Sequence, residues 1–178
     1  MKFTETKIAG CYEIDLFHFR DKRGSFTKTF QKDSFEEQGL DFRFEESFFS
    51  TNSKSVLRGM HFQVPPNDHS KLVYAASRRI LDVLLDVRKA SPTFGKFVSI
   101  EMSFQNHKAI YMPKGIAHGF YCITESTMVY LTSTQQNRES ERGIHWESFG
   151  FKWPNSQPII SERDSGFPKL KDFNSPFE

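Results

Sequence analysis

The stretch Met112–Phe120, MPKGIAHGF, places two turn residues directly before a histidine that enters a strand. Pro113 and Gly115 are the turn signal, and His118 follows in the pattern P-x-G-x-x-H. Turns of this kind precede strands in many proteins, so this stretch decides the fold class only together with its neighbours. The fold class depends on whether the neighbouring segments also have the composition of strands.

Short apolar segments with the composition of strands lie on both sides of this stretch. They are KLVYAA (71–76), ILDVLLDV (80–87), KFVSIEM (96–102), KAIYMP (108–113) and TMVYLTS (127–133). Turn residues separate them, as in KASPTFGK (89–96), and many short strands at such spacing predict an all-β sandwich or jelly roll. The 20 phenylalanines of the chain are expected to pack between the sheets.

Two parts of the chain depart from this strand pattern. The window QKDSFEEQGL (31–40) predicts a short helix, with Asp33 or Ser34 as its cap and Gly39 at its end. The last stretch, 153–178, is rich in Pro, Ser and Asn and is expected to wrap the surface as an irregular tail. At 178 residues, the whole chain 1–178 is expected to form one domain.

Composition excludes several classes of protein. The formal net charge is +2 and no long basic run occurs, which argues against general nucleic-acid binding. Cys11 and Cys122 form neither a metal-spaced pair nor a disulfide framework. Because no apolar signal core or membrane-length segment occurs, we expect a cytoplasmic protein with reduced thiols and no membrane partner. Cys122 is expected to be a small buried residue.

The stretch VLRGMHFQ (56–63) carries a histidine with three open interpretations. His61 is expected at a strand start, with Phe62 on the opposite face. Taken alone, it could be a buried structural imidazole, a metal ligand or a base. A metal site would need further ligands such as a His-x-His pair with a carboxylate, and His69 stands alone in a polar loop. A metal site is therefore disfavoured.

Four further residues have ordinary interpretations when taken singly. Lys71 opens an apolar strand and would point to solvent, since a buried ammonium needs an anionic partner. Tyr130 would be a packing residue whose hydroxyl has found a partner. Asp164 in SERDSG and Arg23 in DKRGSF would be turn residues.

In chain order, these segments resemble one family. DKRGSF, VLRGMHFQ, HSKLVYA, DVRKASPTFGK, MPKGIAHGF, GFKWP and SERD resemble the dTDP-4-dehydrorhamnose 3,5-epimerase family, from about Arg20 to Asp164. The P-x-G-x-x-H spacing is also that of the second motif of cupin barrels. The resemblance implies a cupin-like jelly roll (double-stranded β-helix), a homodimer, no metal or organic cofactor, and a nucleoside-diphosphate 4-keto-6-deoxy sugar as substrate.

The resemblance also implies a mechanism and assigns its residues. A C4 ketone acidifies the hydrogens on C3 and C5, so a base can remove one and leave an enolate. Return of a proton to the opposite face then inverts the centre. His61 would be the base, paired with Asp164, which sets its tautomer. Lys71 would stabilise the enolate oxygen, and Tyr130 would be the proton donor on the opposite sugar face.

Binding residues follow from the same resemblance. His118 would line the sugar pocket, Arg23 and Arg58 would hold the diphosphate, and Phe26 would stack on the base. In the family, N-terminal strands cross to the neighbouring subunit. Arg23 and Phe26 are therefore expected to reach the pocket of the partner.

The nucleotide end departs from the pattern of the family. Lys28 stands where typical members have a glutamate, Glu46 and Phe48 replace a glutamine and an asparagine, and Gln136 replaces a second tyrosine. Because these positions help hold the thymine base or the sugar nucleotide, CDP- or GDP-linked sugars stay open beside dTDP. Inversion at one centre only, C3 or C5, also stays open.

Other classes of function are weaker alternatives. A non-catalytic jelly roll that binds a nucleotide sugar would not need His61, Asp164, Lys71 and Tyr130 together. An isomerase that moves the keto group between C3 and C4 would have a histidine pair that MHFQV lacks, and a metal-dependent cupin would have a ligand cluster. The pathway expected is deoxysugar supply, for example for a surface polysaccharide.

Overall fold

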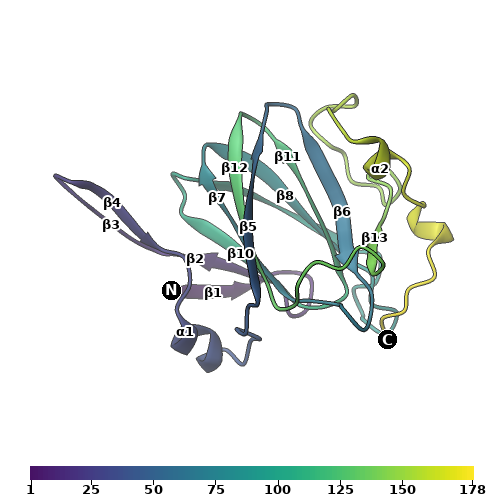
Figure 1. The fold of residues 1–178 in the computed structure, drawn as a ribbon, viewed down its shortest axis with the longest axis horizontal. Helices are drawn as coiled ribbons and strands as arrows, with labels where there is room; N and C mark the ends of the chain where they lie inside the picture. The colour runs from purple at the N-terminus through teal and green to yellow at the C-terminus, as the bar shows by residue number, and fades with distance from the viewer.

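The computed structural model describes all 178 residues and is built mainly of antiparallel strands (Figure 1). A six-stranded sheet runs in the order β1 (Lys2–Glu5), β2 (Tyr12–Asp15), β10 (Lys108–Met112), β7 (Lys71–Ser77), β12 (Ser126–Thr132) and β5 (Glu46–Asn52). A five-stranded sheet runs in the order β13 (Glu141–Gly143), β6 (Leu57–Gln63), β11 (Ile116–Cys122), β8 (Arg79–Asp86) and β9 (Phe97–Ser103). The strands expected within 71–133 are thus confirmed.

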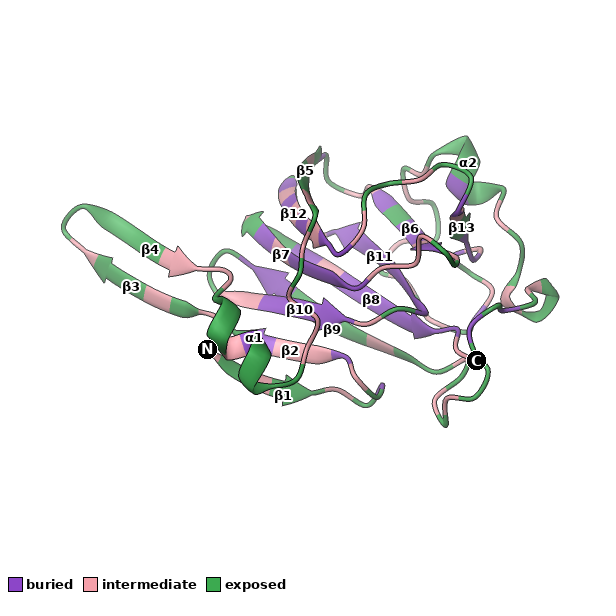
Figure 2. Ribbon diagram, turned by 60° about the horizontal axis from the view of Figure 1, so that its bottom comes forward, coloured by how far each residue is buried: buried purple, intermediate pink, exposed green.

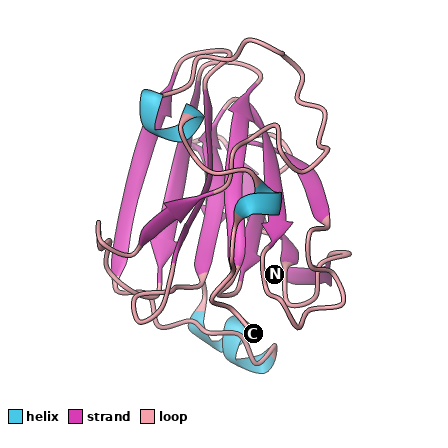
Figure 3. Ribbon diagram, turned by 90° about the vertical axis from the view of Figure 1, so that its right-hand side faces the viewer, coloured by secondary structure: helices cyan, strands magenta, loops and turns pink.

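The chain wraps around the core by changing sheet at nearly every step. From β5 onward it alternates between the six-stranded and five-stranded sheets, except where β8 continues into its neighbour β9. This wrapping is that of a jelly roll and confirms the predicted all-β fold. Figure 3 shows how little of the chain is helical.

Apolar side chains fill the space between the two sheets, but most phenylalanines lie elsewhere. Phe120 and Tyr130 are the only aromatic residues of this central core, which consists mainly of Ile, Leu, Val and Met side chains. Other phenylalanines cover the outer faces of the sheets, around Phe35 on one side and around Phe62 and Phe177 on the other. The prediction that they pack between the sheets was wrong, because chain segments outside both sheets need their own apolar contacts.

The helices differ in detail from expectation. α1 (Lys32–Glu37) begins after Gln31, whose side chain makes no capping hydrogen bond, so neither Asp33 nor Ser34 is the cap. Gly39 follows its end with a φ of +67°, a conformation that glycine adopts without strain. The C-terminal stretch contains α2 (Glu162–Ser165) and the 3₁₀ turn η1 (Leu170–Asp172), and is otherwise irregular as predicted.

The strand that carries His61 also begins earlier than expected. His61 is the fifth residue of β6 rather than the first, and its register partner across the sheet is His118 of β11. A register shift separates this pair from the next pair, Arg58 and Phe120. This irregularity allows Arg58 and His61, three positions apart, to face the same space.

The segment DVRKASPTFG forms a turn that is held by the side chain of Asp86. Its buried carboxylate accepts hydrogen bonds from Arg88 Nε (2.9 Å) and Nη2 (2.7 Å), Ser91 Oγ (2.6 Å) and Thr93 Oγ1 (2.6 Å). Burial works to raise the pKa of the Asp86 carboxyl, but these donors outweigh it and hold the pKa below its ordinary value. The carboxylate therefore ties the end of β8 to the following turn.

Replacing this carboxylate should destabilise the fold. We expect Asp86→Asn to lower the free energy of unfolding by about 3 to 5 kcal/mol, because Arg88 loses its partner in a partly buried site. Since the pKa is depressed in the folded state, the wild type should lose this stabilisation as pH falls below about 4, and the variant should not. Urea unfolding at pH 7 and at about pH 2.5, below the ordinary pKa of an aspartate, checks both points. Asp15→Asn, at an exposed position of β2, is the matched control, and an equal loss in both variants would contradict the role of Asp86.

A two-stranded arm projects from the body of the molecule. β3 (Phe17–Asp21) and β4 (Gly24–Lys28) pair only with each other and extend well beyond the two sheets (Figure 1). The arm is exposed over most of its length (Figure 2), and Phe17, Phe19 and Phe26 are each more than 50% exposed. These three aromatic side chains give the arm an exposed apolar surface.

Both cysteines are buried and free, as expected for Cys122. None of the helices is long and apolar enough to cross a membrane.

Candidate active site

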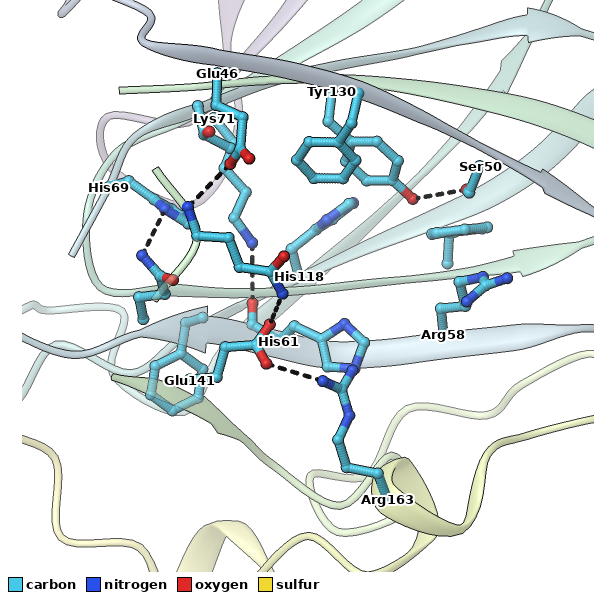
Figure 4. A pocket seen from close by; sticks show the side chains of 16 residues that line it. Glu46, Ser50, Arg58, His61, His69, Lys71, His118, Tyr130, Glu141 and Arg163 are labelled. Atoms are coloured by element: carbon cyan, nitrogen blue, oxygen red, sulfur yellow. Dashed lines mark hydrogen bonds and ion pairs between the residues drawn. The ribbon is translucent and has the colours of Figure 1, made fainter. Parts of the chain in front are cut away.

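A cavity of about 250 Å³ lies between the two sheets and is lined by residues from both (Figure 4). The five-stranded sheet contributes Arg58, His61, Phe62, Gln63, His118, Phe120 and Glu141. The six-stranded sheet contributes Glu46, Phe48, Ser50, Lys71, Tyr130 and Thr132. Three further lining residues, His69, Gln136 and Arg163, come from the segments between and after the strands. A ligand in this cavity would therefore meet different side chains on its two faces.

His61 is paired with a buried carboxylate. Nε2 of His61 lies 2.9 Å from Oδ2 of Asp164, which is 2% exposed. The backbone N–H of Gly59 donates to the same oxygen (3.1 Å), and Arg163 Nε donates to Oδ1 (3.1 Å). Burial works to raise the pKa of Asp164, but these partners outweigh it and lower the pKa to about 2. Asp164 is therefore a fixed anion at neutral pH.

This pairing fixes the tautomer of His61. Nε2 lies 2.9 Å from the Asp164 carboxylate, which only accepts, and 3.2 Å from Nη2 of Arg163, which only donates. We assign the proton to Nε2 because its contact with the carboxylate is shorter, and Nδ1 then carries the lone pair. Nδ1 has no partner within the chain and faces the cavity (Figure 4). Burial lowers the pKa of His61, Asp164 opposes that shift, and the charges of Lys71 and Arg163 add to it. The imidazole is thus neutral near pH 7, with an available lone pair.

Lys71 faces the same cavity from the opposite sheet. It is 9% exposed, so the expectation that it points to solvent was wrong. Its Nζ donates to the backbone carbonyl of His61 (3.3 Å). Burial lowers the pKa of Lys71 to about 8, while the charges of Glu141 and Asp82 oppose the shift. A buried cation therefore lies beside the candidate base.

Tyr130 lies next to Lys71 on the same face of that sheet, in the strand that pairs with β7. Its hydroxyl is 3.3 Å from Ser50 Oγ, and its ring stacks on Phe48 with 4.6 Å between centroids. Burial raises the pKa of the phenol, and the hydrogen bond with Ser50 opposes that rise. Tyr130 thus keeps its proton at neutral pH. In Figure 4 it lies across the cavity from His61.

His118 lines the cavity, and its imidazole is paired with the carboxylate of Asp82. Its Nε2 lies 2.7 Å from Oδ2 of Asp82, and both side chains are buried. Oδ1 of Asp82 is buried without a hydrogen-bond partner. No group of three His, Cys, Asp or Glu side chains in the chain is arranged to hold a metal ion.

Three of the four residues that depart from the family pattern, Glu46, Phe48 and Gln136, line the cavity. Glu46 accepts from the backbone N–H of Gln136 (2.9 Å), and Gln136 Nε2 donates to Glu141 (2.8 Å). Phe48 covers the ring of Tyr130. Arg58 donates through Nε to Asn52 (2.7 Å) and is otherwise exposed.

Three predicted site residues do not reach this cavity within one chain. Arg23 lies in the turn of the arm, Phe26 lies within β4, and Lys28 lies at the base of the arm, and none of them lines the cavity. Arg23 pairs with Asp21 (2.6 Å), and Lys28 contacts Gln31 (3.5 Å). The structure of one chain therefore separates them from His61.

Several lining residues were missed from the sequence. Glu46 and Phe48 alternate with outward residues of β5, and the same period of two leads to Ser50, which could have been found this way. Arg163 precedes Asp164 and contacts it, while its Nη1 pairs with Glu141 (3.0 Å). No spacing rule connects Glu141 of β13 with α2, so that contact could not be predicted.

Comparison with known proteins relates the chain to one family in sequence and in fold. The family model of dTDP-4-dehydrorhamnose 3,5-epimerase matches residues 5–172. An enzyme of that name from Shigella flexneri is 38% identical over 176 residues, 97% of each chain. The crystal structure of one from Elizabethkingia anophelis has a TM-score of 0.92 and 35% identity, covering 98% of this chain and 99% of its own.

A second solved structure contains a ligand. It is a dTDP-6-deoxy-D-glucose-3,5-epimerase from Legionella pneumophila in complex with dTDP-4-keto-L-rhamnose. Its TM-score is 0.92 at 32% identity, covering 97% of this chain and 94% of its own. Matches over nearly the whole length, in sequence and in fold, show that this chain belongs to the dTDP-4-dehydrorhamnose 3,5-epimerase family.

Proposed function

We propose that this protein inverts C3, C5 or both in a nucleoside-diphosphate 4-keto-6-deoxy sugar by way of an enolate. The observation that carries the proposal is the placement of His61 with Asp164 on one sheet, facing Lys71 and Tyr130 on the other. Family membership supports the same reaction class. A binding module would have no use for a base and an acid on opposite sides of one cavity.

His61 removes the proton. Nδ1 takes a hydrogen from the carbon next to the C4 ketone, and the imidazolium that forms is stabilised by Asp164 at 2.9 Å. The electron pair moves from the C–H bond to the ketone oxygen, which becomes an enolate. The ammonium of Lys71 lies beside this position and stabilises the new negative charge.

Tyr130 returns a proton to the other face. Because it belongs to the opposite sheet, its hydroxyl approaches the planar enolate from the side away from His61. Addition of that proton inverts the carbon. One carbon or both can react, depending on which hydrogens the bound sugar presents to His61.

The nucleotide is held at the exposed end of the cavity, where Arg58 suits the diphosphate. dTDP is the nucleotide of the ligand in the Legionella structure. Glu46 and Phe48 leave a different hydrogen-bond pattern there, so CDP- and GDP-linked sugars are the alternative substrates. Binding of free dTDP, CDP and GDP, measured by calorimetry, distinguishes them, and a clear preference for dTDP removes the alternative.

The arm supports a homodimer in which each subunit completes the site of the other. Phe19 and Phe26 are exposed on the arm, and the edge strand β5 exposes Phe48 and Phe49 beside the cavity. A second copy of the chain offers both surfaces at once and would cover these apolar side chains. Arg23 and Phe26 would then meet the nucleotide in the site of the partner.

The compartment we expect is the cytoplasm, and this expectation rests on the sequence.

The pH dependence follows from two groups. The base must be neutral and Lys71 must be charged, so kcat/KM should rise through the lowered pKa of His61 and fall near pH 8, the pKa of Lys71. Lys71→Arg should move the alkaline limb upward while lowering the maximum, since a guanidinium stays charged but has another shape. Initial rates at constant ionic strength give both profiles. A wild-type rate that stays constant up to pH 10 would contradict the role of Lys71.

The function itself is tested by product analysis. The protein is incubated with dTDP-4-keto-6-deoxyglucose, and the sugar is examined by NMR for inversion at C3 and C5. The CDP and GDP analogues are run in parallel. Inversion in any of them supports the proposal, whereas binding without inversion in all three would favour the nucleotide-sugar-binding module.

A further inference from the structure

We propose that Ser50 is a positioning residue that aims the proton of Tyr130 into the cavity, and that Asn52 sets the direction of this hydrogen bond. The inference rests on the proposed function and deepens it. It starts from a hydrogen-bonded chain that joins Tyr130, Ser50, Asn52 and Arg58 along β5 and its neighbours.

Arg58 determines the orientation of the Asn52 amide. A guanidinium only donates, so the atom of Asn52 that lies 2.7 Å from Arg58 Nε must be the oxygen Oδ1. Nδ2 then points to the other side, where it lies 3.1 Å from Ser50 Oγ, 3.1 Å from the Ser50 carbonyl and 3.3 Å from the Ser126 carbonyl. All three neighbours can accept, so the two N–H hydrogens of Nδ2 are shared among three acceptors and neither is left without a partner.

The amide in turn determines the direction of the Ser50 hydroxyl. Because Nδ2 donates to Ser50 Oγ, the single hydroxyl proton of Ser50 is free to be donated elsewhere. Its other partner is the hydroxyl of Tyr130 at 3.3 Å. Donation from Ser50 to Tyr130 is the arrangement that gives the hydroxyl proton of Ser50 an acceptor. It also leaves the proton of Tyr130 free for the cavity that both residues line.

This direction matters most at the moment of proton transfer. The proton moves from the hydroxyl of Tyr130 to the enolate carbon, and the phenolate left behind accepts the hydrogen bond from Ser50. Burial raises the pKa of Tyr130 and Ser50 opposes that rise, which agrees with stabilisation of the phenolate. Before the next turnover, solvent takes the proton from the His61 imidazolium and returns one to the Tyr130 phenolate, so no proton passes through Asn52.

Removing the hydroxyl of Ser50 should separate two events that can be measured, hydrogen exchange at the carbon and inversion of that carbon. In heavy water, a variant with an impaired acid still lets His61 remove a proton and return a deuteron to the same face. We therefore expect Ser50→Ala to raise the ratio of deuterated, uninverted sugar to inverted sugar about tenfold, the effect of losing one hydrogen bond to a developing charge. Mass spectrometry counts the deuterium, and NMR gives the configuration.

Variants of the same strand provide the controls. Ser47→Ala removes a serine that faces away from the cavity and should leave the ratio unchanged. Ser50→Thr keeps the hydroxyl and should restore the ratio. Asn52→Asp keeps the oxygen for Arg58 but removes the donor, so Ser50 would donate to the new carboxylate and the ratio should rise as in Ser50→Ala.

The results of these experiments distinguish a failure of the role of Ser50 from a failure of the proposed function. If the wild type neither exchanges nor inverts with a dTDP-, CDP- or GDP-linked sugar, the proposed function fails and this inference with it. If the wild type reacts but Ser50→Ala leaves the ratio unchanged, or lowers exchange and inversion equally, only the role of Ser50 is overturned. A rise in Ser50→Ala that Ser50→Thr reverses supports it.

Discussion

His61→Asn should lower kcat/KM for epimerisation by about 10²–10⁴-fold, the contribution of a well-placed general base. Asparagine is similar in size and can still hydrogen-bond to Asp164, but its amide does not take up a proton at neutral pH. Because His61 is only partly buried, the variant should fold and bind nucleotide as the wild type does. Initial rates with dTDP-4-keto-6-deoxyglucose, or with the nucleotide that the protein prefers, measure the effect.

A matched control excludes a general effect of losing a histidine. His145→Gln changes a histidine outside the cavity and should keep wild-type kcat/KM. Asp164→Asn is the informative companion, because it keeps the contact with His61 but removes the charge that stabilises the imidazolium. Activity of His61→Asn within about threefold of wild type would contradict the role of His61 as the general base.

Loss of the arm contacts should be equally severe. We expect the double variant Arg23→Ala, Phe26→Ser to lose about 10²-fold or more in kcat/KM, because binding energy from the nucleotide end orients the sugar at His61. Both residues are exposed in the single chain, so the stability of the fold should change little. Analytical ultracentrifugation reports whether the variant remains dimeric, and calorimetry with the preferred nucleotide reports the loss of binding.

Complementation shows whether the arm serves the neighbouring subunit. A heterodimer of this arm variant with His61→Asn contains one site that combines an intact His61 with an intact arm. Random pairing of equal amounts should restore about a quarter of wild-type activity, since half of the dimers are mixed and each mixed dimer has one good site. Coexpression of two differently tagged chains provides the mixture. An active wild-type monomer, or inactive mixed dimers, would contradict the shared site.

The fold was predictable because strands have a local signal. The five segments expected between residues 71 and 133 are all strands, and their short spacing identified the jelly roll. The start of β6 was placed too late because the turn residue Gly59 lies inside the strand. The outer position of most phenylalanines was not predictable, because it depends on which segments cover each sheet.

The site residues were predictable where the sequence segments that carry them resemble the family. His61, Asp164, Lys71 and Tyr130 are brought together as the resemblance implied, although they come from three strands and a short helix. A residue taken alone could give the wrong prediction, as Lys71 shows. It is buried because the opposite sheet covers it, and no local sequence pattern reveals that contact. The direction of the chain from Arg58 to Tyr130 required atomic distances, since it depends on which atom of an amide faces a guanidinium.

Deuterium incorporation in heavy water tests the central claim most directly, because it reports C–H cleavage next to the ketone without assuming a product. The wild type is incubated with dTDP-, CDP- and GDP-linked 4-keto-6-deoxyglucose, and each sugar nucleotide is weighed by mass spectrometry. The proposed mechanism predicts deuterium from solvent in at least one of them. Two deuterons would mean that C3 and C5 both react, and one that a single centre does. An unchanged mass in all three would contradict proton abstraction by His61.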